Sequence, residues 1–301
     1  MGLDNDGVRF LLHAHNLGVS FAETAMVGRQ FLLTDAKTLT QNLRRFGFDA
    51  TEKEAARMLA ESDGYAESFL RFLGARVADS FDASDYESAT DIHDFNEPIP
   101  AKYKNKYSAV IDGGTLEHIF NFPTAIKNCM EMVKVGGHFL NITPTNNFLG
   151  HGFYQFSPEL FFRIFTRENG YAKPRVYIFE VGLNCDWYEV SDPDEVKERV
   201  ILANHEPSYL LVIAKKEREA EIFKNTPQQS DYSAVWQESG ETGEKIRYTY
   251  DPPTRTPLMR LQNLPFAALR RFNRQVNRAF GMLNSRPRHF KKVKSESGKL
   301  E

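Results

Sequence analysis

Cysteine, tryptophan and long apolar runs are scarce in this chain. The 301 residues include two cysteines and two tryptophans, which argues against a disulfide framework and fits a reducing compartment. No apolar run approaches the roughly 18 residues of a membrane-spanning helix. The first ten residues, MGLDNDGVRF, place acidic residues before apolar ones, the reverse of a signal peptide. We therefore expect a soluble, cytoplasmic protein.

Net charge is nearly absent as well, because a basic segment offsets an acidic body. The formal charge is −2, yet eleven of the 38 lysines and arginines lie between Arg255 and Lys294, a stretch without Asp or Glu. The rest of the chain carries 27 basic against 40 acidic residues. The sequence thus predicts an acidic body followed by a basic tail.

Residues 264–283 of this tail have the apolar spacing of a helix, with arginines at other positions. A basic amphipathic helix can contact an anionic membrane surface, follow a phosphate backbone, or dock on the chain's own acidic body or on a second subunit. No nucleic-acid-binding signature accompanies the charge, so nucleic acid is the least favoured partner. Peripheral membrane or complex contact through 258–294 stays open, as does the oligomeric state.

With 41% apolar residues, a chain of 301 residues can bury the core of one large α/β domain and an appendage. Helical and strand patterns alternate through its first 216 residues. The segment Thr51–Glu54 has the form of a capping box. We predict helices over 7–17, 38–46, 51–72 and 157–165, and strands over 19–27, 76–81, 89–93, 107–111, 138–142, 176–181 and 209–214.

The stretch from Tyr107 to Pro158 organises the predicted fold. Its first apolar run ends at Asp112 before two glycines, and an amphipathic helix leads to a second apolar run that breaks at Pro144. In an open parallel sheet, ligands bind at the carboxyl ends of the strands. Segments 112–118 and 143–156 are therefore expected to share one crevice, the candidate active site.

The sequences IDGGTLEHI, VKVGGHFL and NNFLGHGFYQFSPELF in this stretch resemble class I S-adenosylmethionine-dependent methyltransferases, in the branch with a Leu-Glu-His signature after strand four. The likeness extends over roughly residues 19–216 and is stronger in the second half. It implies an α/β, Rossmann-like fold with a mostly parallel, doubly wound sheet, an antiparallel last strand and a C-terminal extension. It also implies S-adenosylmethionine as the cofactor.

Five residues match cofactor-binding positions of that family. Gly28 ends the first strand and would pass the methionine end, while Asp82 follows the second strand and would bind the ribose hydroxyls. Asp94 would accept a hydrogen bond from the adenine amino group, with Phe95 beside the ring. Asp112 ends strand four. Alternatively, Gly28 is an ordinary turn glycine, Asp82 a surface acid and Asp94 the start of a turn.

The Gly-x-Gly-x-Gly turn of the family is absent. The sequence has Met26-Val27-Gly28-Arg29-Gln30 there, and 54 positions separate Gly28 from Asp82, where a dinucleotide site expects about 20. A helical insertion over 31–73 accounts for the extra length and can cover the pocket as a lid. The lost glycines also leave room for an alternative, a catalytically inactive binding or scaffold protein in a biosynthetic complex.

Candidate catalytic residues are Glu117, His118 and His151. Histidine is readily tuned to take a proton near neutral pH, so His118 or His151 is a candidate general base for a hydroxyl acceptor, with Glu117 to orient it. The alternative is structural: the Glu-His pair ties the start of the helix to nearby loops, and His151 holds its own loop.

These three residues are also metal-ligand types. In some small-RNA 2′-O-methyltransferases, a Glu-x-x-Glu-His site completed by a later His lies in this place. Here Gly114 occupies the first Glu position, so one ligand is missing. Three ligands and water can still serve Mg²⁺ or Zn²⁺, but no metal is predicted.

The chain thus divides into a methyltransferase-like domain over 1–216, a polar linker or surface excursion over 217–257, and a basic helix and tail over 258–301. The predicted activity is methyl transfer from S-adenosylmethionine to oxygen of a small-molecule or glycan-type acceptor. The acceptor class rests on the aromatic and polar loop around 153–156, which should border the crevice.

Overall fold

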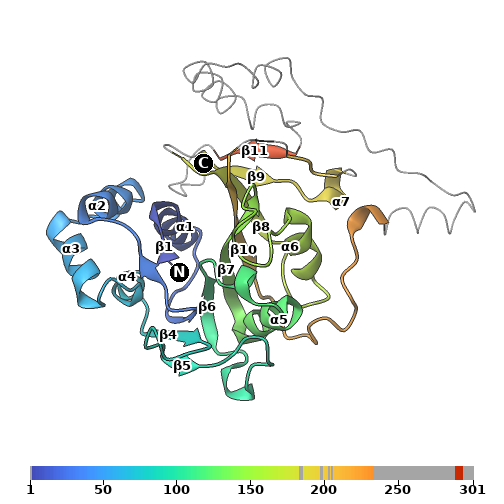
Figure 1. The fold of residues 1–301 in the computed structure, drawn as a ribbon, viewed down its shortest axis with the longest axis horizontal. Helices are drawn as coiled ribbons and strands as arrows, with labels where there is room; N and C mark the ends of the chain where they lie inside the picture. Colours follow the sequence, from blue (N-terminus) through green and yellow to red (C-terminus); the bar gives the residue numbers. More distant parts are fainter. Residues whose placement is uncertain are drawn as a thin grey trace, which may run out of the picture.

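The computed structural model describes residues 2–182, 186–196, 199–202, 204, 206–232 and 289–293. In this part of the chain, nine strands form one sheet in the order β11-β9-β8-β10-β7-β6-β2-β4-β5, with helices on both faces (Figure 1). Five strands are parallel to one another: β5 (Asp91–Ile92), β4 (Val77–Asp82), β2 (Glu23–Val27), β6 (Tyr107–Asp112) and β7 (Val133–Asn146).

The other strands are antiparallel to their neighbours. Strand β10 (Ser208–Lys215) lies between β7 and β8 (Arg175–Glu180) and is antiparallel to both. Strands β9 (Tyr188–Val190) and β11 (Phe290–Lys292) extend that edge. The predicted antiparallel strand at the end of the sheet is confirmed, as is the mostly parallel, doubly wound sheet.

The strand order reverses between β2 and β6. From β2 the chain proceeds outward to β4 and β5, then returns to β6 on the other side of β2 and continues to β7. Val27 at the end of β2 is the register partner of Asp112 at the end of β6. Ligands of doubly wound sheets bind outside the carboxyl ends at such a switch point. The fold therefore places a candidate site beside Gly28 and Asp112.

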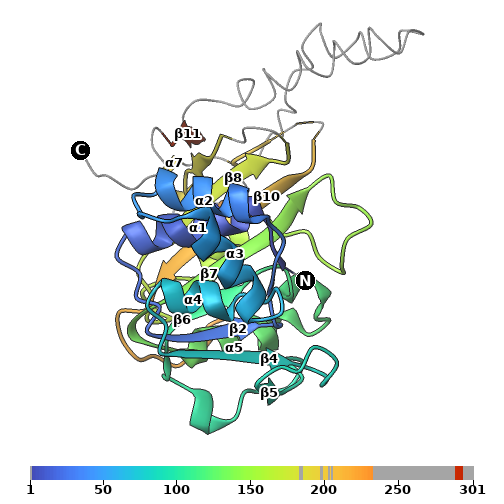
Figure 2. The same cartoon turned by 90° about the vertical axis from the view of Figure 1, so that its left-hand side faces the viewer.

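The helices divide between the two faces of the sheet (Figures 1 and 2). Each face has its own buried apolar cluster, so the sheet is covered on both sides, as parallel strands require. One face carries α1 (Asn5–Asn16), α2 (Ala36–Arg45), α3 (Glu52–Glu61) and α4 (Glu67–Phe72), and the other carries α5 (Phe122–Met132) and α6 (Pro158–Ile164); α7 (Pro193–Val196) is short.

The helix predicted over 51–72 is two helices, α3 and α4. The capping box is confirmed, since the Thr51 side chain accepts from the Glu54 N–H and the Glu54 side chain accepts from the Thr51 N–H. After α3, Gly64 adopts a φ of +82°, and its carbonyl accepts from the Leu32 N–H at 2.8 Å. The helix is interrupted where Gly64 pairs with Leu32, some 30 residues earlier in the chain. The apolar spacing of residues 51–72 gives no sign of this long-range contact.

The strand predicted over 138–142 is too short at both ends, because β7 runs from Val133 through Pro144 to Asn146. Strand β6 ends at Asp112, opposite Asn141, so the last part of β7 pairs with β10 alone. A proline is tolerated at a strand position that has only one neighbouring strand. Ile142, in the part of β7 that continues past the end of β6, lines the candidate site.

Part of the chain beyond Lys216 packs on the folded body. Ile222 and Phe290 are 2% and 7% exposed and belong to the buried cluster on the α5 and α6 face. The remainder of the predicted linker after residue 232, and the basic helix over 264–283, lie outside the described residues. Among the described helices, none combines the length and the apolar character needed to cross a membrane.

Candidate active site

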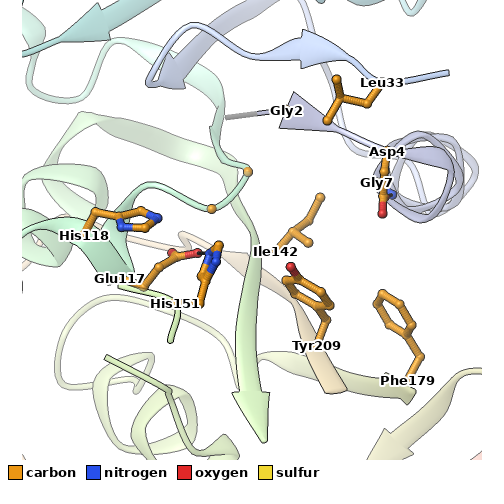
Figure 3. A pocket seen from close by; sticks show the side chains of 12 residues that line it. Gly2, Asp4, Gly7, Leu33, Glu117, His118, Ile142, His151, Phe179 and Tyr209 are labelled. Atoms are coloured by element: carbon orange, nitrogen blue, oxygen red, sulfur yellow. Dashed lines mark hydrogen bonds and ion pairs between the residues drawn. The ribbon is translucent and has the colours of Figure 1, made fainter. Parts of the chain in front are cut away.

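A cavity of about 190 Å³ lies at the carboxyl ends of β6 and β7 (Figure 3). Its other wall is formed by β1 (Gly2–Leu3), which pairs with β3 (Phe31–Leu32), and by the start of α1. Glu117, His118 and His151 lie together on one side, across from Tyr209. The lining residues are Gly2, Asp4, Gly7, Leu33, Gly113, Gly114, Glu117, His118, Ile142, His151, Phe179 and Tyr209.

Asp112 fixes the turn that carries Glu117 and His118. One carboxylate oxygen accepts from the N–H groups of Thr115 and Leu116, at 2.8 and 3.4 Å. The other accepts from the Asn141 side chain at 2.5 Å. Asp112 is fully buried, and burial raises the pKa of its carboxyl to about 7. Asp112 therefore holds the turn whose residues line the cavity.

Glu117 is fully buried although it lines the cavity. Its Oε2 accepts from the Thr143 hydroxyl at 3.4 Å. Its Oε1 has no hydrogen-bond partner and lies 3.5 Å from Nε2 of His151. Burial, and then repulsion by Asp112, raise the pKa of Glu117 to about 8. The two carboxyl groups therefore retain a proton near neutral pH.

The loop that follows β7 brings His151 to Glu117. The backbone carbonyl of Glu117 accepts from the N–H groups of Phe153 and Tyr154, at 2.8 and 3.2 Å. Gly152 has a φ of +69°, and a Cβ there would lie 2.7 Å from the same carbonyl oxygen. Only glycine fits this close approach without strain. The loop is thus held against the turn that carries the other two candidate residues.

The rings of His118 and His151 contact each other, with centroids 5.0 Å apart and planes at 61°. Partial burial, and then the neighbouring His151, lower the pKa of His118. A neutral imidazole at pH 7 can accept a proton, as a general base must. All three predicted catalytic residues therefore line one cavity, as expected from their positions at the strand ends.

The turn after β2 is filled by its own side chains. Gly28 has a φ of +72°, and its N–H donates to the carbonyl of Phe81 at 2.7 Å. Arg29 points to Glu67, with Nε 2.7 Å from the carboxylate, and its Nη1 donates to the carbonyl of Glu87 at 2.9 Å. Gln30 is fully buried and donates to the carbonyls of Val27 and Gly28.

The other predicted cofactor residues make local contacts. Asp82 is half-buried and accepts from the Ser84 N–H at 3.0 Å. Asp94 is exposed and accepts from the Asn96 backbone and side chain, which lowers the pKa of Asp94. Phe95 is 4% exposed and packs edge to face on Phe81 in the core. The cavity lining includes none of Gly28, Asp82, Asp94, Phe95 and Asp112.

Sequence reasoning missed the wall opposite the histidines. Asp4 caps α1 by accepting from the Gly7 N–H at 2.9 Å, and Tyr209 comes from β10. Burial, and then the charges of Asp4 and Glu117, raise the pKa of Tyr209 to about 12. The pattern Asp4-Asn5-Asp6 is a visible helix-start signal, but nothing local indicates that this helix start faces β10.

No family model matches this sequence, and no curated protein matches it. Solved structures with a similar arrangement include a methyltransferase from Thermotoga maritima, described as a possible histamine N-methyltransferase, at 13% identity and a TM-score of 0.30, covering 69% of this chain and 92% of that one. A methyltransferase from Archaeoglobus fulgidus has 9% identity and a TM-score of 0.36, covering 70% and 94%. The branched-chain polyamine synthase of Thermus thermophilus, solved with N4-aminopropylspermidine and 5′-methylthioadenosine, has 13% identity and a TM-score of 0.36, covering 73% and 58%. The similarity is one of fold.

Proposed function

We propose that this protein transfers a methyl group from S-adenosylmethionine to an oxygen of a small-molecule or glycan-type acceptor. The observation that carries the proposal is the meeting of Glu117, His118 and His151 in one cavity, beside the switch point of a methyltransferase-like sheet. A site at this edge of the sheet can hold an acceptor next to a cofactor bound over the neighbouring strand ends.

Methyl transfer to a hydroxyl requires the side chains to remove only one proton. The acceptor oxygen forms a bond to the methyl carbon as the sulfur–carbon bond breaks, and the hydroxyl proton passes to an imidazole. Alignment of the two reactants provides most of the rate in such a displacement. His118 or His151 takes the proton, and Glu117, whose Oε1 lies 3.5 Å from Nε2 of His151, orients that ring.

The cofactor would lie over the ends of β2, β4 and β5. Asp82 would bind the ribose hydroxyls and Asp94 the adenine amino group, with Phe95 nearby and Gly28 at the methionine end. The turn contact of Asp94 uses one carboxylate oxygen, and a carboxylate has about four acceptor positions in all. Asp112 would contribute through the turn that it caps.

A second candidate function is a catalytically inactive binding or scaffold protein. It is favoured by Gln30, whose side chain is buried and so close to Gly113 that a Cβ there would lie 2.6 Å from its Oε1. Bulk at this position narrows the space between the ends of β2 and β6. This candidate retains a folded body and predicts no methyl transfer.

Calorimetric titration with S-adenosylmethionine and S-adenosylhomocysteine tests the proposal. We expect micromolar binding that weakens by tenfold or more, ~1.4 kcal/mol, in Asp82→Ala. The control is Asp85→Ala, an exposed acid of the same loop, which should bind as the unchanged protein does. Absence of binding by folded protein would overturn the assignment. Binding without methyl transfer to any hydroxyl acceptor of a broad screen would favour the second candidate.

A further inference from the structure

The side chains of Glu117, His118 and His151 each direct a potential metal-ligand atom to a common point. One atom from each, a carboxylate oxygen or an imidazole nitrogen, lies within 4.8 Å of the other two. The three come from two separate segments, the turn after β6 and the loop after β7, and they share one side of the cavity (Figure 3). Their convergence is therefore produced by the fold and not by sequence spacing alone.

The spacing is close to that of a tetrahedral zinc site. Zinc bonds of about 2.0–2.1 Å separate neighbouring ligand atoms by about 3.3 Å and place two imidazole rings on one ion with centroids about 5 Å apart. In this structure, Oε1 of Glu117 and Nε2 of His151 are 3.5 Å apart, and the two ring centroids are 5.0 Å apart. His118 is exposed and His151 half-buried, so neither ring is held in the packed core.

Glu117 is the residue whose surroundings most favour a bound cation. It is fully buried, and its Oε1 has no hydrogen-bond partner while it faces the two histidine rings. A buried carboxylate without a partner is costly, and such groups are usually paired with a cation or bound to a metal. The other oxygen, Oε2, accepts from Thr143, so the free oxygen is the one on the side of the histidines.

Neighbouring hydrogen bonds orient the proposed ligands, as outer-shell contacts do in protein metal sites. Thr143 contacts the far oxygen of Glu117, and the Glu117 carbonyl accepts from the N–H groups of Phe153 and Tyr154. These bonds fix the loop of His151 relative to the turn of Glu117. A glutamate at position 114 is not required for this metal site, because three protein ligands and one open position are sufficient for a catalytic zinc.

We propose that Glu117, His118 and His151 bind one Zn²⁺ ion, with a fourth coordination position open to the cavity. Two imidazoles and one carboxylate suit zinc, whereas Mg²⁺ prefers a shell of oxygen ligands. The binding of the ion is independent of the proposed methyl transfer. In that reaction the ion would lower the pKa of an acceptor hydroxyl at its open position, and His118 and His151 would act as its ligands in place of a general base; this role rests on the proposed function.

Metal binding is tested on the full chain, stripped with a chelator and dialysed. Zinc is titrated in competition with a chromophoric chelator, and Co²⁺ is used to read geometry from its visible absorption. We expect one equivalent of Zn²⁺ and a tetrahedral Co²⁺ spectrum, with affinity at least about a hundredfold weaker in Glu117→Gln and His151→Ala. His93→Ala, outside the cavity lining, is the matched control and should bind zinc normally.

These experiments test zinc binding separately from methyl transfer, because no cofactor or acceptor is added. Zinc that binds as tightly to folded His151→Ala as to the unchanged protein would overturn the proposal, as would a stripped protein that takes up no zinc. Circular dichroism checks that each variant is folded, and His151, half-buried on a loop, can be replaced with little risk to the core. Zinc uptake without S-adenosylmethionine binding would sustain the site and overturn the proposed function.

Discussion

Arg29 and Glu67 form an ion pair of 2.7 Å that joins the turn after β2 to the first turn of α4. The guanidinium also lies 3.9 Å from the centroid of the Tyr65 ring and reaches the carbonyl of Glu87 in the loop after β4. The residue directly after Gly28 therefore carries a side chain that ties three segments together. In this chain, the turn is held by side-chain contacts.

Arg29→Ala is expected to destabilise the protein by about 1–3 kcal/mol, because it leaves the Glu67 carboxylate, 13% exposed, without its partner and removes the contact with Tyr65. Chemical denaturation provides the measurement. The control is Arg57→Ala, whose ion pair with Glu61 is largely solvent-exposed and should contribute almost nothing. Equal effects of the two substitutions would show that the Arg29 contacts do not stabilise the turn.

Much of the site could be predicted from residues at strand ends. Asp112, the two glycines after it, and His118 follow one apolar run, and His151 follows the next, so parallel-strand topology alone brings them to one edge. The strands themselves follow from the same local patterns, whereas the antiparallel direction at the end of the sheet is expected from the resemblance to methyltransferases. The strength of these predictions is that each depends on short-range periodicity and on one general rule of doubly wound sheets.

The remainder depends on contacts between segments far apart in the sequence. Asp4 and Tyr209 line the same cavity, and Gln30 is placed beside Gly113. The break between α3 and α4 arises because the Gly64 carbonyl pairs with Leu32. No local pattern encodes these pairings, because the same residues would be acceptable at a solvated helix start, in a turn or on a strand surface.

Gly152→Ala should disturb the loop of His151 more than any other small change there. A methyl group would lie 2.7 Å from the Glu117 carbonyl at a φ of +69°, so we expect a loss of about 2 kcal/mol or more. The matched control is Gly150→Ala, whose added Cβ meets nothing within 4 Å. Thermal melts of both variants measure the difference, and an unchanged melting temperature in Gly152→Ala would show that the loop can leave Glu117 without cost.

Phe290→Ala tests whether β11 is an integral part of the sheet. Phe290 is 7% exposed, pairs with Val190 of β9 and belongs to the main apolar cluster. Loss of its ring should cost about 3–5 kcal/mol. Lys291 on the same strand is exposed, and Lys291→Ala should leave stability nearly unchanged. If denaturation midpoints of the two variants coincide, then β11 contributes little to the folded body.

Glu117→Gln should change the pH dependence of stability in a defined direction. Burial and Asp112 raise the pKa of Glu117 from its ordinary 4.5 to about 8, so between these values the folded state binds more protons than the unfolded state. The contribution of Glu117 is fully present below pH 4.5 and is lost as the pH rises through about 8. Glutamine is neutral throughout, so the variant should gain stability relative to the unchanged protein as the pH increases.

Thermal melts in the presence of a chelator, at intervals from pH 5 to pH 9, measure this difference without interference from bound metal. We expect the stability gap between Glu117→Gln and the unchanged protein to widen by at least about 1 kcal/mol across the range, since one unit of pKa shift corresponds to ~1.4 kcal/mol. Glu97→Gln, at an exposed position outside the cavity lining, is the control and should follow the unchanged protein. A gap that stays constant with pH would mean that Glu117 is ionised in the folded state at neutral pH.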